Sequence, residues 1–350
     1  MEEVKMDLSN IKSEQKRNTL TALTGGTPKD VPCWFKDCQM VFVSPMGERP
    51  PLGESEGYDI YGVHLSASES AGGAFTPTPT YPPVLSDITK WEEQVKFPDY
   101  DAIDWDAACE ADLKAQNLDR ENKVIDMFCA NGLFERMHYL MGFEDTVCSL
   151  YEEPEAVKEL AEAIADTKIR LIKNTIKRYK PDVFTFLDDY AHQNGLFMSI
   201  DMFRDIFKPQ LKRIVDAVHE EGCLFKMHCC GKMQDLTPEY LDLGIDAIDP
   251  VMPLNDIQKM KDMFEHRVGI AGGLDVQGVI DNTASTADDV RAEVRRCIDE
   301  YAPGGGYMLY CASVNIRDPR QWEPDGIFGA MLDEVSTYGK DYYARQYQTV

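Results

Sequence analysis

The feature that most constrains this chain is a regular alternation of apolar runs and amphipathic stretches that begins near Lys123. Its six apolar runs are KVIDMFC, DVFTFL, CLFKMHCC, IDAIDPV, RVGIAGGL and GGYMLYC. They lack the period-2 pattern of a strand with one solvated face, which is typical of parallel strands covered on both faces. The stretches between them have helical spacing, most clearly at 154–180, 199–220, 256–264 and 286–301. Repetition of strand, helix and strand predicts a parallel α/β sheet.

The number of predicted strands favours a (β/α)8 TIM barrel. A helix is expected at 13–23, and the apolar run at 31–35 is predicted to be a first strand ahead of the six later ones. An eighth strand, in the N-terminal insertion or the C-terminal segment, would complete the barrel. Since barrels of this type run past about 250 residues as one unit, we expect residues 1–350 to form a single barrel domain.

The region at about 44–115 predicts a loop-rich N-terminal insertion. Its first half is rich in Gly, Pro, Ser and Thr and has few apolar pairs at helical spacing, so we expect one or two short hairpins there. Its aromatic residues indicate that it packs as a wall or lid over a pocket: Tyr58, Tyr61, Phe75 and Tyr81.

The charge of the chain limits its partners. With 61 Asp and Glu against 36 Lys and Arg, the net charge is −25. An acidic surface repels phosphate groups, so we expect neither a nucleic acid nor a membrane as a partner. No apolar stretch reaches the ~18 residues of a membrane span, and the polar N-terminus lacks the apolar middle of a secretory signal. The ten cysteines are therefore expected to be reduced thiols of a cytoplasmic protein.

Ionisable and sulfur side chains gather where the predicted strands end. In a barrel, the active site lies at the carboxyl ends of the strands and is built from several strand tips. Residues placed there by the pattern are Asp188, Asp189, His228, Cys230, Asp249, Asp275 and Cys311. The sequence therefore predicts one site to which several strands contribute.

His228, Cys230 and Cys311 form the most specific candidate group. One imidazole and two thiolates suit Zn²⁺, and three protein ligands leave a position for water or substrate, as in catalytic zinc sites. The step from His228 to Cys230 fits an extended strand end with Cys229 pointing away. The alternative is a chance cluster of core cysteines, because H-x-C with one remote Cys is not a specific pattern.

Other residues at the strand ends have two interpretations each. Asp188 and Asp189 could handle protons or supply a fourth zinc ligand, or could cap a helix, and His192 could contact substrate. Glu135 could face the barrel mouth or stabilise a helix start. Three aromatic residues could line a substrate pocket or belong to the core. These aromatic residues are Phe128, Tyr190 and Tyr310. The candidate substrate-binding residues are these three together with Glu135 and Asp275.

Three segments carry a resemblance to a known superfamily. They read FLDDYAHQNGLFMSIDMFRDIFKP at 186–209, FKMHCCGKMQDLTPEYLDLGIDAIDPV at 225–251 and VGIAGGLDVQGVI at 268–280. They resemble the uroporphyrinogen decarboxylase superfamily, in which one strand ends in H-x-C-G and later strands carry G-[IV]-D-x-[IL] and GG-[LIV]-D. The resemblance extends from about residue 129 to the C-terminus. It implies a (β/α)8 barrel with its site at the carboxyl face of the strands.

The superfamily has two branches that differ in their site residues. The decarboxylases carry an arginine-rich N-terminal segment that binds substrate carboxylates, whereas the corresponding text here, DVPCWFKDCQMVFVSP, has no arginine. The cobalamin-dependent methyltransferases carry H-x-C and a distant Cys as zinc ligands, which is similar to His228, Cys230 and Cys311. The resemblance therefore implies Zn²⁺ at these residues and a cobalamin (corrinoid) cofactor supplied by a partner protein.

Within that branch, the N-terminal insertion and the DDYAHQ segment most resemble the first methyltransferase of O-demethylase systems. This implies transfer of a methyl group from a methoxylated aromatic compound to the Co(I) corrinoid of a partner protein, with Asp188, Asp189 or His192 orienting or protonating the leaving phenol. Methylcorrinoid:thiol and methylcorrinoid:tetrahydrofolate transfer remain alternatives, because the same ligands serve both directions. Porphyrinogen-type decarboxylation is the least favoured of the functional hypotheses.

Overall fold

A seven-stranded parallel sheet forms the centre of the molecule. The computed structural model describes residues 8–50, 53–68, 74–313 and 318–346. Its sheet has the order β1-β5-β6-β9-β10-β11-β12, and each neighbouring pair is parallel. The strands are β1 (Cys38–Val41), β5 (Val124–Cys129), β6 (Val183–Leu187), β9 (Leu224–His228), β10 (Ala247–Val251), β11 (Gly269–Gly273) and β12 (Tyr307–Tyr310).

The six strands predicted after Lys123 are confirmed, whereas the first strand begins at Cys38, seven residues later than the predicted start at Val31. The chain makes a single parallel bridge from Cys33 to Leu309 of β12 before it turns into a short helix, and β1 follows at Cys38. The Asp37 carboxylate accepts the Cys33 N–H at 2.8 Å, and this local contact favours a helical turn over a strand. Among the described residues, the parallel sheet has seven strands, so the eighth strand of a complete barrel is not found.

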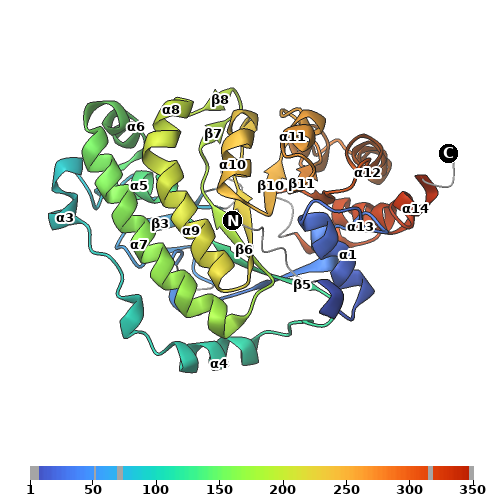
Figure 1. Cartoon of the computed structure of the whole chain (residues 1–350), viewed down its shortest axis with the longest axis horizontal. Helices are drawn as coiled ribbons and strands as arrows, with labels where there is room; N and C mark the ends of the chain where they lie inside the picture. The colour runs from blue at the N-terminus through green and yellow to red at the C-terminus, as the bar shows by residue number, and fades with distance from the viewer. Residues whose placement is uncertain (1–7, 51–52, 69–73, 314–317, 347–350) are drawn as a thin grey trace.

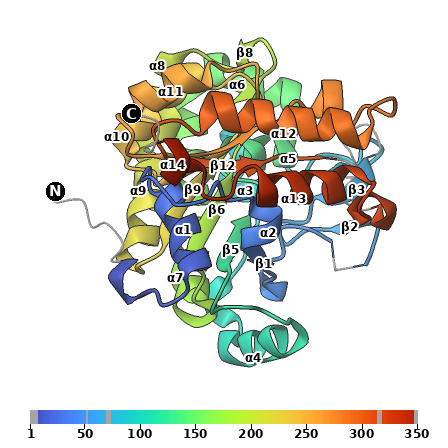
Figure 2. The same cartoon turned by 90° about the vertical axis from the view of Figure 1, so that its right-hand side faces the viewer.

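Helices cover the outside of the sheet, as the α/β pattern predicts (Figure 1). The long helices α7 and α9 lie side by side, and α12 and α13 pack together beyond the other end of the strand series (Figure 2). The helices are α1 (Glu14–Leu23), α2 (Trp34–Asp37), α3 (Trp91–Gln94), α4 (Trp105–Ala115), α5 (Phe134–Met141), α6 (Phe143–Glu152), α7 (Pro154–Tyr179), α8 (Ile200–Met202), α9 (Lys208–Glu220), α10 (Thr237–Leu243), α11 (Ile257–Met263), α12 (Ala287–Tyr301), α13 (Ile327–Thr337) and α14 (Tyr342–Gln346).

The starts of two predicted helices are explained by their caps. The Ser13 hydroxyl accepts the Lys16 N–H ahead of α1. Thr286 and Asp289 form a reciprocal capping box at the start of α12. Between α8 and α9 the chain keeps helical form through a π turn, η6 (Phe203–Phe207), so the single helix predicted at 199–220 is observed with one irregular turn.

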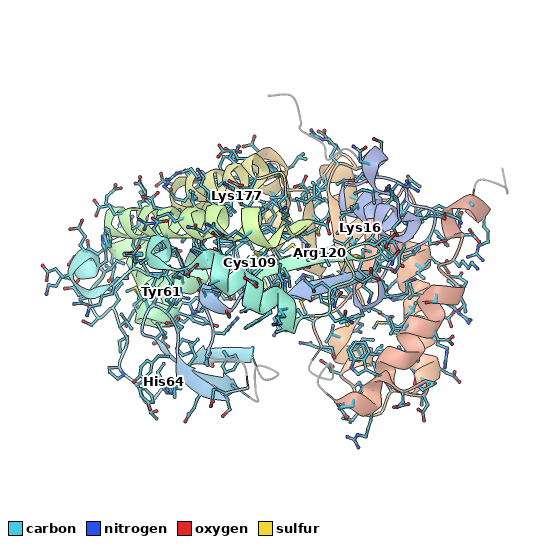
Figure 3. The ribbon with its side chains drawn as sticks, turned by 90° about the horizontal axis from the view of Figure 1, so that it is seen from below. Lys16, Tyr61, His64, Cys109, Arg120 and Lys177 are labelled. Carbon is cyan, nitrogen blue, oxygen red and sulfur yellow. The ribbon has the colours of Figure 1, made fainter. Side chains whose placement is uncertain are left out.

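The predicted insertion contains a small antiparallel sheet in the order β2-β3-β4. Its strands are β2 (Glu56–Tyr58), β3 (His64–Ser68) and β4 (Ala74–Pro77), which confirms the expectation of short hairpins. This sheet stands at one side of the molecule, where Tyr61 and His64 are labelled in Figure 3. Its residues pack against α5, since the Tyr139 hydroxyl donates to the Phe75 carbonyl at 2.8 Å.

A buried cluster of charges holds the insertion to the helices. Arg136 of α5 pairs with Glu48 and Asp59, and Lys168 of α7 is 2.5 Å from Glu48. All four side chains are nearly inaccessible to solvent. Because isolated charges are costly to bury, the cluster requires these segments to stay together.

None of the described helices combines the length and the apolar character that a membrane span requires.

Candidate metal centre and cavity

Three potential metal ligands meet at the carboxyl ends of β6 and β9. One ligand atom from each of Asp189, His228 and Cys230 lies within 4.8 Å of the other two. The His228 Nε2 to Cys230 Sγ distance is 3.6 Å, and Asp189 Oδ1 accepts the Cys230 N–H at 2.6 Å. The parallel register causes this meeting, because Leu187 of β6 pairs with His228 of β9 directly before the aspartates.

His228 is oriented by a buried chain of charges. Its Nδ1 is 2.6 Å from Asp249 Oδ1, at the paired position on β10. Lys226 lies between Asp249 and Asp126, at 2.6 and 2.7 Å. The two aspartates hold the pKa of Lys226 above its usual value despite burial. This arrangement leaves His228 Nε2 directed at the site, as in carboxylate–histidine–metal triads.

Asp249→Asn is expected to weaken zinc binding by about 10–100-fold, the usual cost of removing an outer carboxylate partner of a metal-bound histidine. Lys226 keeps its contact with Asp126 in this variant, so the fold should persist. A competition titration with a chromophoric chelator measures the affinity. Asp246→Asn is the matched control, since Asp246 contacts His219 at 2.8 Å away from the site. Equal zinc affinity in both variants would contradict the orienting role.

The donor set fits a divalent cation. Burial raises the pKa of the Cys230 thiol well above its usual value, and the Asp189 carboxylate adds to this effect. Burial also raises the pKa of Asp189. Because the two groups lie close together with His228, a bound cation would favour their deprotonated forms and offset the cost of burying them. One nitrogen, one sulfur and one oxygen donor suit Zn²⁺.

Gly231 allows the loop that carries Asp189 and the loop that carries Cys230 to lie close together. Gly231 follows Cys230 with φ +86°, and a Cβ there would lie 2.8 Å from the Ala191 carbonyl atoms. The Lys232 N–H donates to the His192 carbonyl at 2.8 Å across the same contact. A side chain at position 231 would therefore push the loop of Asp189 away from that of Cys230.

Cys311, the second thiol of the predicted ligand set, lies outside the group of three. It follows β12, which is separated from β9 by β10 and β11 in the sheet. Its side chain is 3% exposed and belongs to an apolar cluster that includes Cys33 and Leu309. The pairing of Cys311 with His228 and Cys230 therefore stays a prediction. Cys229 is fully buried and its Sγ accepts the Tyr190 N–H at 3.4 Å, so it points away from the site as expected.

Asp188 and Asp189 have different surroundings although they are adjacent. Asp188 is completely buried and its oxygens accept the N–H groups of Leu133, Phe134 and Glu135, which caps α5. Burial raises the pKa of Asp188 to about 6. Of the two interpretations of Asp188, the geometry matches the helix cap, whereas its neighbour Asp189 lies with the candidate ligands His228 and Cys230.

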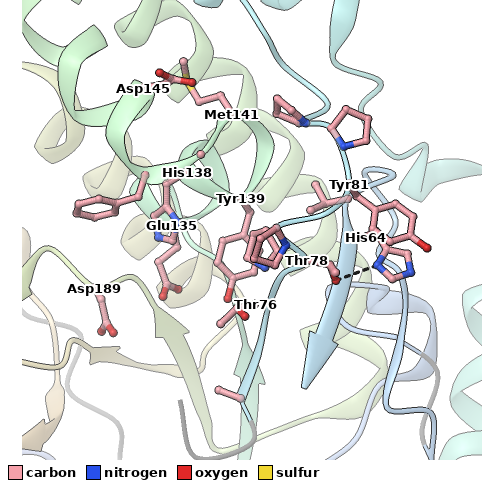
Figure 4. Close-up of a pocket in the computed structure, with 18 of the residues that line it drawn as sticks. His64, Thr76, Thr78, Tyr81, Glu135, His138, Tyr139, Met141, Asp145 and Asp189 are labelled. Atoms are coloured by element: carbon pink, nitrogen blue, oxygen red, sulfur yellow. Dashed lines mark hydrogen bonds between the residues drawn. The ribbon is translucent and has the colours of Figure 1, made fainter. Parts of the chain in front are cut away.

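A cavity of about 730 Å³ opens beside the candidate metal ligand Asp189 (Figure 4). One wall is formed by the insertion, including His64, Thr76 and Tyr81, which agrees with the predicted wall over a pocket. The opposite wall comes from α5 and α6. Asp189 lines the cavity as well, so a molecule bound in it would reach the candidate metal site.

Glu135 lies on the wall of this cavity near Asp189 (Figure 4). Its side chain is more than nine-tenths buried, and its Oε2 atom has no hydrogen-bond partner in the described structure. Burial raises the pKa of Glu135 well above its usual value, and Asp189 and Asp188 add to the shift. An unpaired buried carboxyl oxygen beside a cavity is suited to contact a ligand.

The remaining candidates lie at varied distances from this site. The Phe128 ring is edge-on to His228, with 5.5 Å between centroids, and it lines a second cavity of about 580 Å³.

Tyr310 packs on Trp34, and Tyr190 is buried against Phe203 and Phe207. His192 is exposed and stacks on Phe197. Asp275 accepts the Gly278 N–H and starts a helical turn. The structure thus brings Phe128 and Glu135 to the site and gives Tyr190 and Asp275 structural contacts.

Two features of the structure were not predicted from the sequence. They are the buried ion pairs of Lys226 with Asp126 and Asp249, and the buried charge cluster around Arg136. A signal existed for the first, since Asp126 and Lys226 stand in the middle of apolar strands. Charged residues in strands buried on both faces must be paired. The partners of Arg136 come from the loop-rich insertion, where no periodicity indicates which carboxylates turn inward.

Comparison with known proteins agrees with the fold. The family model described as uroporphyrinogen decarboxylase (URO-D) matches residues 76–312. A curated uroporphyrinogen decarboxylase from Geobacillus kaustophilus is 29% identical over 169 residues, which are 48% of this chain and 45% of that protein. The chain thus aligns with less than half of this relative's length.

A solved structure of a methyltransferase from Methanosarcina mazei has the same fold. The match has a TM-score of 0.62 and covers 93% of this chain and 99% of that chain, at 14% sequence identity. The family match covers the six parallel strands from β5 to β12, together with Asp189, His228, Cys230 and Cys311. The chain therefore belongs to the uroporphyrinogen decarboxylase (URO-D) family.

Proposed function

We propose that this protein is a zinc-dependent methyltransferase that moves a methyl group from a methoxylated aromatic compound to the Co(I) corrinoid of a partner protein. The observation that carries the proposal is the meeting of Asp189, His228 and Cys230 beside a 730 Å³ cavity. The resemblance adds Cys311 as a further thiolate ligand. The likeness in fold to the Methanosarcina mazei methyltransferase supports a methyltransferase, and the alignment with a decarboxylase supports the family alone.

The cavity is a poor match for a porphyrinogen. Its described lining residues include the carboxyl groups of Glu135, Asp145 and Asp189, and no Lys or Arg. A porphyrinogen bears eight carboxylates and would need cations to offset them. The lining combines aromatic and proline side chains and Met141 with several polar groups, which suits a small aromatic molecule that carries polar substituents.

The methyl ether is inert because phenolate is a poor leaving group. In the proposed reaction the bond from methyl carbon to oxygen breaks, its electron pair stays on oxygen, and Co(I) supplies both electrons of the new bond. A zinc ion at the site would act as a Lewis acid toward the ether oxygen. The cavity walls would position the ring, and Asp249 keeps His228 oriented.

The test follows the Co(I) absorption band in anaerobic mixtures of the purified protein, Co(I) cobalamin and a panel of methoxyarenes. We expect the band to decay with at least one methoxyarene and a demethylated phenol to appear in equal amount. Cys230→Ser should abolish the decay, and Cys148→Ser, which changes an exposed cysteine of α6, should leave it unchanged. Demethylation of methylcobalamin by a thiol or a folate, without any reaction of methoxyarenes, would favour the alternative direction of transfer.

A further inference from the structure

The second cavity, of about 580 Å³, lies beside β1 and the segment that leads into the insertion. It shares none of its described lining residues with the first cavity. Its walls are mostly apolar and include Met40, Phe42, Met46 and Phe128. Met40 and Phe42 are 50% and 45% exposed, so these walls can be reached from solvent. A concave, mainly apolar space of this volume is typical of a small-molecule site.

Three charged residues line this cavity, and two of them are compensated by buried partners. The three are Glu48, Arg49 and Asp59. Glu48 pairs with both Arg136 and Lys168, and Asp59 pairs with Arg136. These two carboxylates and two cations balance one another within the protein. Arg49 is therefore the charged lining residue whose positive charge has no counterpart in this cluster.

The guanidinium of Arg49 has N–H groups without a partner. Its Nη1 donates to the Phe75 carbonyl at 2.8 Å and lies 3.5 Å from the Tyr139 hydroxyl, whereas Nε and Nη2 have no hydrogen-bond partner among the described residues. None of the described carboxylates lies within ion-pair distance of it, and its side chain is partly buried. An arginine side chain is always protonated in proteins, and its planar fork of N–H groups matches a carboxylate.

We propose that the second cavity binds a small aromatic carboxylate, whose carboxylate group pairs with Arg49 and whose ring packs against Phe42 and Phe128. The apolar walls suit the ring, and the uncompensated guanidinium suits the charge. Since Phe128 is edge-on to His228, the bound molecule would contact a ring that itself lies against the candidate metal site. This inference goes beyond the proposed function, because it concerns a second ligand in a cavity that the methyl donor does not occupy.

The experiment is calorimetric titration of the purified full-length protein at pH 7 with naphthalene-2-carboxylate and naphthalene-2-carboxamide. The two compounds have nearly equal size and differ in charge. We expect the carboxylate to bind about tenfold or more tightly than the carboxamide, because its hydrogen bonds to a guanidinium are charge-assisted. The titration is repeated after dialysis against a chelator. A carboxylate held by Arg49 should keep its affinity there, whereas one bound to a metal ion would lose it.

Variants of Arg49 test the origin of the preference. Arg49→Gln removes the charge and keeps an N–H donor for the Phe75 carbonyl, so the two compounds should bind with nearly equal affinity. Arg49→Lys keeps the charge without the planar fork and should retain part of the preference. Arg213→Gln is the control, because Arg213 is exposed, pairs with Asp166 and lines neither cavity.

A matched pair of phenylalanine variants locates the ligand. Phe42→Ala removes a wall of the second cavity and should weaken the binding of both compounds by about tenfold. Phe143→Ala removes a ring of similar exposure, 43%, from the first cavity and should leave both affinities unchanged. Because this pair leaves Arg49 in place, it decides the location even where Arg49→Gln lowers the stability of the protein.

The outcomes that overturn this inference leave the proposed function standing. They are equal affinity for the two compounds, an unchanged preference in Arg49→Gln, loss of binding with the metal, a larger effect of Phe143→Ala than of Phe42→Ala, and no binding of either compound. The proposed function fails on a different result, namely that no methoxyarene is demethylated.

Discussion

Arg136→Leu is expected to destabilise the protein by about 3–5 kcal/mol, the cost of removing one partner from a buried ion pair. Arg136 is fully buried, and its Nη1 is 2.5 Å from Asp59 Oδ2 while Nη2 bonds to Glu48. Without the guanidinium, Glu48 keeps Lys168 at 2.5 Å. Asp59 keeps only the N–H groups of its own turn, from Tyr61 and Val63, and becomes a buried charge without a cation. The free energy of unfolding, measured by urea denaturation, checks this.

A matched set of variants distinguishes the loss of stability caused by breaking a buried ion pair from that caused by breaking an exposed one. Arg213→Leu removes an exposed pair with Asp166 and should cost no more than about 1 kcal/mol. The triple variant Arg136→Leu, Glu48→Gln, Asp59→Asn removes the uncompensated charges and should regain much of the loss. The insertion should also become more sensitive to protease in Arg136→Leu, because the cluster holds it to α5. A loss no greater than that of Arg213→Leu would refute the anchoring role.

The parallel strands were predictable because burial on both faces leaves a clear pattern. The run at 182–187 became β6 (Val183–Leu187), and its neighbours agree equally well with the sequence. The error at 31–35 has a local cause. The composition there favours a strand, but the side chain of Asp37 captures the Cys33 N–H and turns the chain. Such competition between side chain and backbone depends on geometry that hydrophobic periodicity does not contain.

The site was predictable to the extent that strand ends determine it. His228 and Cys230 share one strand end, and Asp189 follows the paired strand, so the register brings them together. Cys311 follows a strand three places away in the sheet. Whether it meets the others depends on the curvature of the sheet and on the loop after β12, which residue spacing does not encode. The same holds for Glu135, because its approach to Asp189 depends on how Asp188 caps α5.

Cys230→Ser and His228→Ala are expected to lose bound zinc. Removing a direct ligand should cost more than the about 10–100-fold that follows loss of an outer partner, because two of the gathered donors cannot form a stable site. Zinc content after dialysis against a mild chelator, measured by mass spectrometry, shows the loss directly. Cys148→Ser and Cys297→Ser are controls for an exposed and a buried cysteine away from the three ligands.

Cys311→Ser distinguishes the contribution of the second thiol. The resemblance places Cys311 on the metal, whereas its side chain lies in an apolar cluster outside the gathered ligands. We expect Cys311→Ser to weaken zinc binding less than Cys230→Ser, because part of the binding energy of that thiolate is spent in drawing its strand end toward the other ligands. Zinc that stays stoichiometric in both variants would refute the ligand set. An equal loss in both would mean that the metal draws Cys311 in fully, with Asp189 left as the displaceable fourth ligand.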